Sequence, residues 1–159
     1  MFDKFGEFNS VEELNEKAAE LKAAGDEKEL IALAEENGID KEDAEDYMDG
    51  GFEKLATPFI AAVGKLELEA KKLALKGGLS DWKDCIIQYC SEDEAICRGV
   101  RQREKKLAVC LGQLLKFGFD NKQRVHDEII KAAGLKPPIY MGIPAKAEAR
   151  KIIREYYMK

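Results

Sequence analysis

Few residues in this chain of 159 have the chemistry for nucleophilic or general-base catalysis. A histidine-based dyad or triad would have to use the single histidine, His126. His126 stands beside Asp127 and Glu128 on the polar side of an expected helix, which indicates a solvated surface side chain. The three serines are Ser10, Ser80 and Ser91. Each fits a helix cap and none stands in a Gly-x-Ser-x-Gly elbow, so we expect no catalytic site.

The four cysteines are spaced too widely for a usual zinc site. Zinc ligands pair about two to four residues apart, whereas Cys85 and Cys90 are five apart and Cys97 and Cys110 follow at longer intervals. On helices, they are expected to be small buried hydrophobic residues with reduced thiols. The 13 glycines form no phosphate-binding loop or dinucleotide fingerprint. The sequence therefore predicts no metal and no cofactor, and a protein that acts by binding.

Charge is divided unevenly along the chain. Residues 1–50 hold 17 Asp and Glu against 5 Lys, a net charge of −12. Residues 51–159 hold 21 Lys and Arg against 14 Asp and Glu, a net charge of +7. Such asymmetry indicates two faces that prefer different partners, or two halves that dock and neutralise each other.

Helix caps predict an acidic three-helix unit over residues 1–51. Ser10 and Glu13 form a capping box, and Asp26 and Asp40 begin the second and third helices. The expected helix ends are Gly25, Asn37-Gly38 and, after a short helix to about Met48, Gly50-Gly51. Because the boundary has no Ser- or Gly-rich linker composition, we expect this unit to pack against the rest of the chain.

Residues 52–159 are predicted to form a larger, basic helical body. The expected helix starts are Thr57-Pro58, Ser80, Ser91, Asp120 and Pro144, and the helix from Ser91 runs to about Phe117 with a break near Arg101. Residues 135–143, which include Pro137-Pro138, are expected to form an extended loop. The mid-helix glycines Gly64, Gly99 and Gly112 indicate close helix packing. No segment alternates as a strand does, so we predict an all-α fold of about seven or eight helices.

Residues 33–39, followed by Ala44, have the spacing of a helix-turn-helix. In DNA-binding versions the second helix lies close to phosphates. Here it carries five carboxylates, which a polyanion would repel: Glu42, Asp43, Glu45, Asp46 and Asp49. We therefore expect these residues to bind a basic protein groove of the kind that holds nucleic acid. A merely solvated face is the alternative.

A basic cluster in the second half is the candidate nucleic-acid-binding site. It comprises Arg98, Arg101, Arg103, Lys105 and Lys106. Basic residues near aromatic ones can bind nucleic acid. The nearby Tyr156 and Tyr157, however, fall on the apolar stripe of the last helix and are expected to be buried. Nucleic-acid contact and a patch that is solvated or docked to an acidic neighbour both stay open.

Several segments resemble small proteins of Firmicutes mobile elements. They are Met1–Phe8, Ala34–Asp46, Ile129–Gly134, Met141–Pro144 and Ile152–Tyr157. The second half is loosely similar to PcfK-like proteins of conjugative elements, some of which are anti-CRISPRs that inhibit the RNA-guided effector nuclease of type II systems. The resemblance covers most of the chain, but its motifs are structural and transfer no functional residue.

The resemblance implies a non-enzymatic inhibitor that binds a CRISPR effector nuclease or its RNA-bound complex. The acidic residues of the third helix are the expected contact, because an anionic module is attracted to a basic channel. The alternatives are a nucleic-acid-binding accessory factor of plasmid or conjugative-element transfer, which would use the basic cluster, and a scaffold in an element-encoded complex.

No apolar run approaches the roughly 18 residues that a membrane span needs. The first residues, Met1–Phe5, lack the basic and apolar regions of a secretory signal. We therefore expect a cytoplasmic protein that does not bind membranes.

Overall fold

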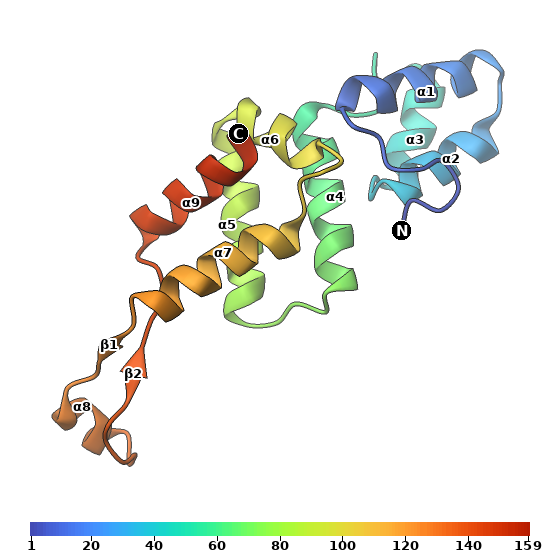
Figure 1. Ribbon diagram of the computed structural model, residues 1–159. Helices are drawn as coiled ribbons and strands as arrows, with labels where there is room; N and C mark the ends of the chain where they lie inside the picture. The colour runs from blue at the N-terminus through green and yellow to red at the C-terminus, as the bar shows by residue number, and fades with distance from the viewer.

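The computed structural model describes all 159 residues and contains nine helices and one two-stranded hairpin (Figure 1). The predicted all-α fold is confirmed. The elements are α1 (Val11–Ala23), α2 (Glu27–Glu36), α3 (Lys41–Met48), α4 (Pro58–Lys72), α5 (Gly78–Glu92), α6 (Glu94–Arg101), α7 (Leu107–Asp120), β1 (Gln123–Arg124), α8 (Asp127–Ala132), β2 (Tyr140–Met141) and α9 (Lys146–Met158). None of these helices has the length and apolar character that crossing a membrane requires.

Helices α1, α2 and α3 form an N-terminal unit with a core of its own. Ser10 Oγ accepts a hydrogen bond from the Glu13 amide at 3.2 Å, and the Glu13 carboxylate accepts one from the Asn9 amide at 2.7 Å, so α1 begins as expected. Asp26 caps α2 by accepting from the Glu29 amide at 3.1 Å. The core contains 12 buried residues, including Leu14, Ala18, Leu30, Leu33, Ala44 and Tyr47.

A second core of 16 buried residues lies among α4, α5, α6, α7 and α9. Ile86, Ile96 and Leu114 are fully buried in it. Helix α9 packs on α6 and α7 and contributes Ile153 and Tyr157 to this core. Ala61 belongs to the first core and Ala62 to the second, so the two cores meet at the start of α4.

Two mid-helix glycines let backbones touch. A Cβ atom on Gly64 would clash with the carbonyl oxygen of Asn37 at the end of α2, and one on Gly99 would clash with that of Tyr157 in α9. The expectation of close packing is therefore confirmed at both positions. It is wrong for Gly112, because no atom of a packed neighbour lies within 4 Å of the place where its Cβ would be.

Residues 121–143, which we call the arm, extend away from the body at the end opposite the N-terminal unit (Figure 1). Strands β1 and β2 pair antiparallel, with Gln123 opposite Met141 and Arg124 opposite Tyr140. Helix α8 lies at the tip, and Ile130 is the one buried residue of the arm. The sequence showed no strand because two residues per strand are too few to reveal an alternating pattern.

Ser91 and Asp120 do not begin helices, although the sequence predicts that they do. Ser91 lies in the last turn of α5, where its hydroxyl donates to the Gln88 carbonyl at 2.6 Å, and Asp93 caps α6 instead. Asp120 ends α7 rather than beginning a helix. Both errors arise because a polar residue inside or at the end of a helix looks like a cap when the next helix follows closely.

His126 is an N-cap rather than a mid-helix residue. Its Nδ1 accepts a hydrogen bond from the Glu128 amide at 3.2 Å, at the start of α8. The side chain is exposed, as expected.

Ser80 is no cap, since α5 begins at Gly78. The expected break near Arg101 is confirmed, because α6 ends there.

Candidate functional site

The carboxylates of α3 lie on the surface of the N-terminal unit. Ala44 and Tyr47 hold the helix against α1 and α2. Glu42, Asp46 and Asp49 are exposed, and Asp43 and Glu45 are half-buried. Their single ion pair is internal to the helix, between Lys41 and Glu45 at 3.2 Å. None of the five is therefore neutralised by the basic body.

The basic cluster, in contrast, is engaged within the chain. Arg101 is 2% exposed, and its Nη2 donates to Oδ1 of Asn37 at 3.0 Å. Its guanidinium also lies 5.6 Å from the centre of the Phe2 ring. The expectation that Arg101 belongs to a surface patch is wrong, because the N-terminal unit covers it. Arg98 is exposed but forms ion pairs with Glu12 and Glu94.

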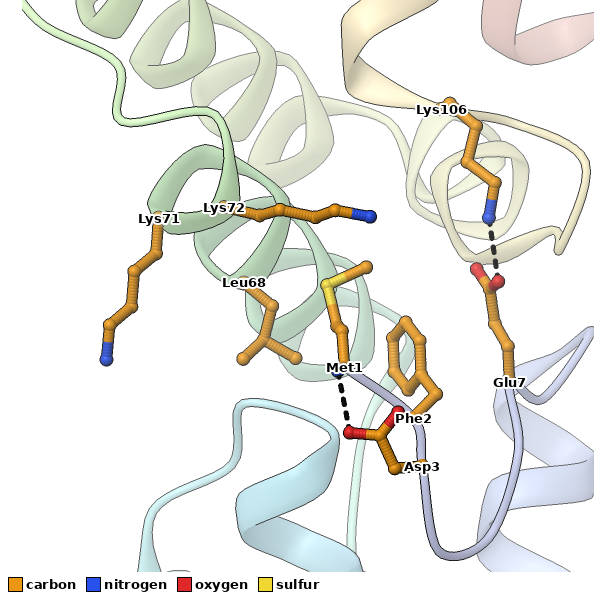
Figure 2. A pocket seen from close by; sticks show the side chains of 8 residues that line it. All are labelled: Met1, Phe2, Asp3, Glu7, Leu68, Lys71, Lys72 and Lys106. Carbon is orange, nitrogen blue, oxygen red and sulfur yellow. Dashed lines mark hydrogen bonds and ion pairs between the residues drawn. The ribbon is translucent and has the colours of Figure 1, made fainter.

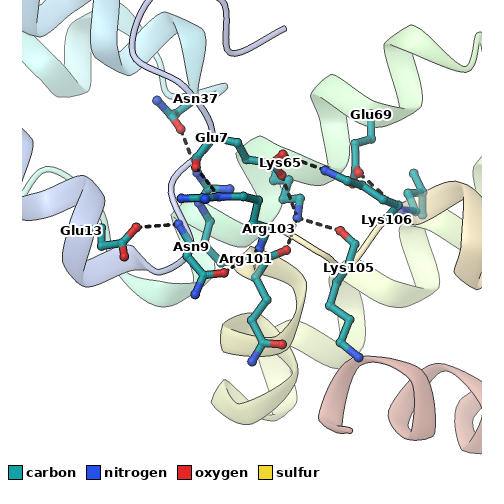
Figure 3. Close-up of polar contacts among 12 residues, drawn as sticks. Glu7, Asn9, Glu13, Asn37, Lys65, Glu69, Arg101, Arg103, Lys105 and Lys106 are labelled. Atoms are coloured by element: carbon teal, nitrogen blue, oxygen red, sulfur yellow. Dashed lines mark hydrogen bonds and ion pairs between the residues drawn. The ribbon is translucent and has the colours of Figure 1, made fainter.

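The loop after α6 contacts the segment before α1 (Figure 3). The Arg103 amide donates to Asn9 Oδ1 at 3.0 Å, and its Nε donates to the Glu7 carbonyl at 2.9 Å. Lys106 Nζ lies 2.7 Å from Glu7 Oε2. Lys105 instead contacts α9, donating to the Tyr156 carbonyl at 2.9 Å. The cluster thus joins parts of the chain together.

Behind these contacts lies a buried polar group that the sequence analysis missed. Lys65 of α4 is 1% exposed and donates to the carbonyls of Gln102 at 2.6 Å and Lys105 at 2.8 Å. Its Nζ also lies 3.2 Å from Glu7 Oε1. Glu69, one turn further along α4, accepts from the Leu107 amide at 3.4 Å. The signal was present, because Lys65 and Glu69 interrupt the buried stripe of α4 four residues apart.

Burial shapes the pKa values of this group. It lowers the pKa of Lys65 and raises the pKa of Glu69, each only partly offset by the charge of the other. Burial also raises the pKa of Glu7, but the hydrogen bonds and charges of Lys106 and Lys65 outweigh it, so the pKa lies below its ordinary value. We call these residues, Glu7, Lys65, Glu69, Arg101 and Lys106, the polar junction.

An open hollow of about 750 Å³ adjoins the polar junction, between the N-terminal segment and α4 (Figure 2). Its polar lining mixes Asp3 and Glu7 with Lys71, Lys72 and Lys106. The amino group of Met1 is held by Asp3 at 3.0 Å. The lining includes no serine, cysteine or histidine. The hollow therefore holds no Ser–His or Cys–His pair of the kind that activates a nucleophile.

The cysteines lie in the second core. Cys90, Cys97 and Cys110 are buried, Cys85 is half-buried, and all four are free thiols. Cys97 Sγ donates to the Cys90 carbonyl at 2.9 Å, and burial raises the pKa of Cys110 to about 12. A thiol with a raised pKa is a poor nucleophile and a poor metal ligand. No group of three or more His, Cys, Asp or Glu side chains is placed to hold a metal ion.

No family model, no curated protein and no solved structure matches this chain.

Proposed function

We propose that the chain is a non-enzymatic binding protein whose acidic helix α3 docks on a basic surface of a nucleic-acid-handling protein. The partner that we propose is an RNA-guided type II CRISPR effector nuclease, which the protein inhibits. The observation that carries the proposal is that all five carboxylates of α3 lack an ion pair with the basic half of the chain.

The charge at the C-terminal end of α3 is unfavourable for the helix, whereas Glu42 and Asp43 lie in its first turn, where negative charge is favourable. Its last turn holds Glu45 and Asp46 and no basic residue, and Asp49 follows as the C-cap. Negative charge at a helix C-terminus opposes the helix dipole and costs about 0.3–1 kcal/mol per residue. Carboxylates that cost stability and lie exposed are better explained by a contact with a cationic partner than by folding.

A guided nuclease offers a suitable surface. It holds its nucleic-acid duplex in a positively charged channel, and the protein recognises the duplex through the nucleic-acid backbone. An exposed row of carboxylates on a rigid helix can occupy such a channel, and long-range attraction speeds the encounter. The basic cluster does not support the transfer-factor alternative, since its residues already contact Glu7, Asn9, Glu12, Asn37 or Tyr156.

The test is a triple charge reversal of the exposed α3 carboxylates, Glu42→Lys, Asp46→Lys and Asp49→Lys. We expect affinity for a guide-loaded type II effector nuclease to fall by at least about tenfold at low salt, with loss of inhibition of DNA cleavage. The matched control reverses Glu104, Glu148 and Glu155, which are exposed on the body and make no ion pair. This control carries the same change in net charge and should bind within about twofold of the original chain.

Circular dichroism establishes that both variants keep their helices. If both variants bind the nuclease with the same affinity, any loss of affinity is due to net charge alone, and a contact through α3 is contradicted. Absence of binding by the unaltered chain would overturn the proposed partner.

A further inference from the structure

The arm carries large apolar side chains that its own fold cannot bury. Those of Ile129, Leu135, Tyr140, Met141 and Ile143 are between 55% and 68% exposed. Side chains of this size are usually packed, and a group of them on one protruding element indicates a surface that another molecule covers. A two-stranded hairpin with one short helix offers only Ile130 as a core.

The arm is also basic. It holds Lys122, Arg124, Lys131 and Lys136 against Asp127 and Glu128, and all four cations are exposed. Arg124 pairs with Asp127 at 2.9 Å, and Lys122 lies 4.2 Å from the centre of the Phe119 ring. Lys131 and Lys136 form no ion pair. A partner for this surface should therefore combine apolar groups with negative charge.

The N-terminal unit presents a surface of that kind. A hollow of about 780 Å³ lies between α1, α3 and the segment before α4. Phe52, 48% exposed, and Tyr47 supply its apolar part, and the carboxylates of Glu16 and Glu53 at its border make no ion pair. The lining contains two cations, Arg98 and Lys54. Arg98 is already paired with Glu12, so Lys54 is the only cation there that could repel a basic partner. The unit around the hollow carries a net charge of −12 over residues 1–50.

The arm lies at the end of the molecule opposite α1 and α3, which border this hollow (Figure 1). An arm cannot reach the hollow of its own chain, but two copies placed side by side and antiparallel bring each arm to the other's hollow. We propose that the chain forms such a symmetric dimer, in which the basic, apolar arm of each copy docks in the acid-bordered hollow of the other. Twofold symmetry then makes the same contact twice and closes the assembly.

Two charge-reversal variants test this dimer by analytical ultracentrifugation. The arm variant carries Lys131→Glu and Lys136→Glu, and the hollow variant carries Glu16→Lys and Glu53→Lys. Each alone places like charges across both contacts, so we expect its dimer dissociation constant to rise by at least about tenfold. In an equimolar mixture, the heterodimer pairs opposite charges at both contacts and should form as readily as the original dimer.

The mixture separates this arrangement from others. If the arms paired with each other, the hollow variant alone would remain dimeric, which contradicts the proposal. A chain that is monomeric at every concentration also overturns it, as does an arm–hollow assembly that grows beyond two copies without closing. Met141→Ser should weaken the dimer, whereas Leu79→Ser, at an exposed apolar position on α5 outside both surfaces, should not. The result is independent of nuclease binding, because no nuclease is present.

Discussion

The acidic helix α3 and the basic cluster at the end of α6 differ in what the fold does with their charges. The carboxylates of α3 stay on the surface with a single ion pair inside their own helix. The basic residues instead hold parts of the same chain together. Arg101 is buried against Asn37, and Lys106 pairs with Glu7. A charged run in a sequence therefore indicates a binding surface only when the fold leaves its members without partners. In this protein the polar junction supplies partners for Arg101 and Lys106, whereas no such group lies beside the carboxylates of α3.

The largest expected effect concerns Lys65, the most buried cation of the polar junction. Lys65→Met keeps most of the side chain's length but leaves the carbonyls of Gln102 and Lys105 without their donor and removes one of the two cations beside Glu7. Removing one partner of a buried pair costs about 3–5 kcal/mol, so we expect a loss of about 3 kcal/mol in the free energy of unfolding. Urea denaturation measures it. Lys71→Met, exposed on the same helix, should change the value by less than about 0.5 kcal/mol.

A smaller effect is expected for Glu7→Gln, with a defined dependence on pH. The pKa of Glu7 lies below its ordinary value of 4.5, so its carboxylate stabilises the fold above that pH. This stabilisation is lost as the pH falls through the lowered pKa of the folded state. We expect the variant to be less stable by about 1.5 kcal/mol at pH 7, as for a hydrogen bond to a charged group. The difference in stability between the variant and the original chain should shrink as the pH falls below 4.5, and a constant difference would contradict this role.

The smallest effect has the opposite sign and lies on α3. Asp49→Lys replaces a carboxylate at the C-cap with a cation that favours the helix dipole. We expect thermal unfolding to show a gain of about 0.5 kcal/mol, while binding to the proposed partner weakens. A stable variant that binds as well as the original chain would remove Asp49 from the contact. Glu104→Lys, exposed in the loop before α7, serves as the control for a change of charge alone.

Local signals in the sequence predicted much of the fold. Ser10, Asp26 and Thr57 were recognised as caps, and each accepts the expected amide hydrogen bond. These signals act over three residues and need no knowledge of the rest of the chain. Ser91 and Asp120 failed because the same residue types also occur in last turns, where the neighbouring helix decides their role.

The availability of the candidate site residues depended on contacts that are distant in the sequence. The buried side chain of Arg101 donates a hydrogen bond to Asn37, 64 positions away, and the Arg103 amide donates to Asn9, 94 positions away. No spacing rule reports such contacts. Lys65 and Glu69 were the exception that could have been found, because charged residues on the buried stripe of a helix require polar partners. That inference identifies the polar junction but not the residues that complete it.

The separation of the two cores has a consequence for synthesis of the chain. The first core is complete once Ala61 has left the ribosome, whereas the second needs Ile153 and Tyr157 from the final helix. Domains generally fold as units in the order in which they emerge. The N-terminal unit can therefore close during translation, while about 100 residues of the chain have still to leave the ribosome.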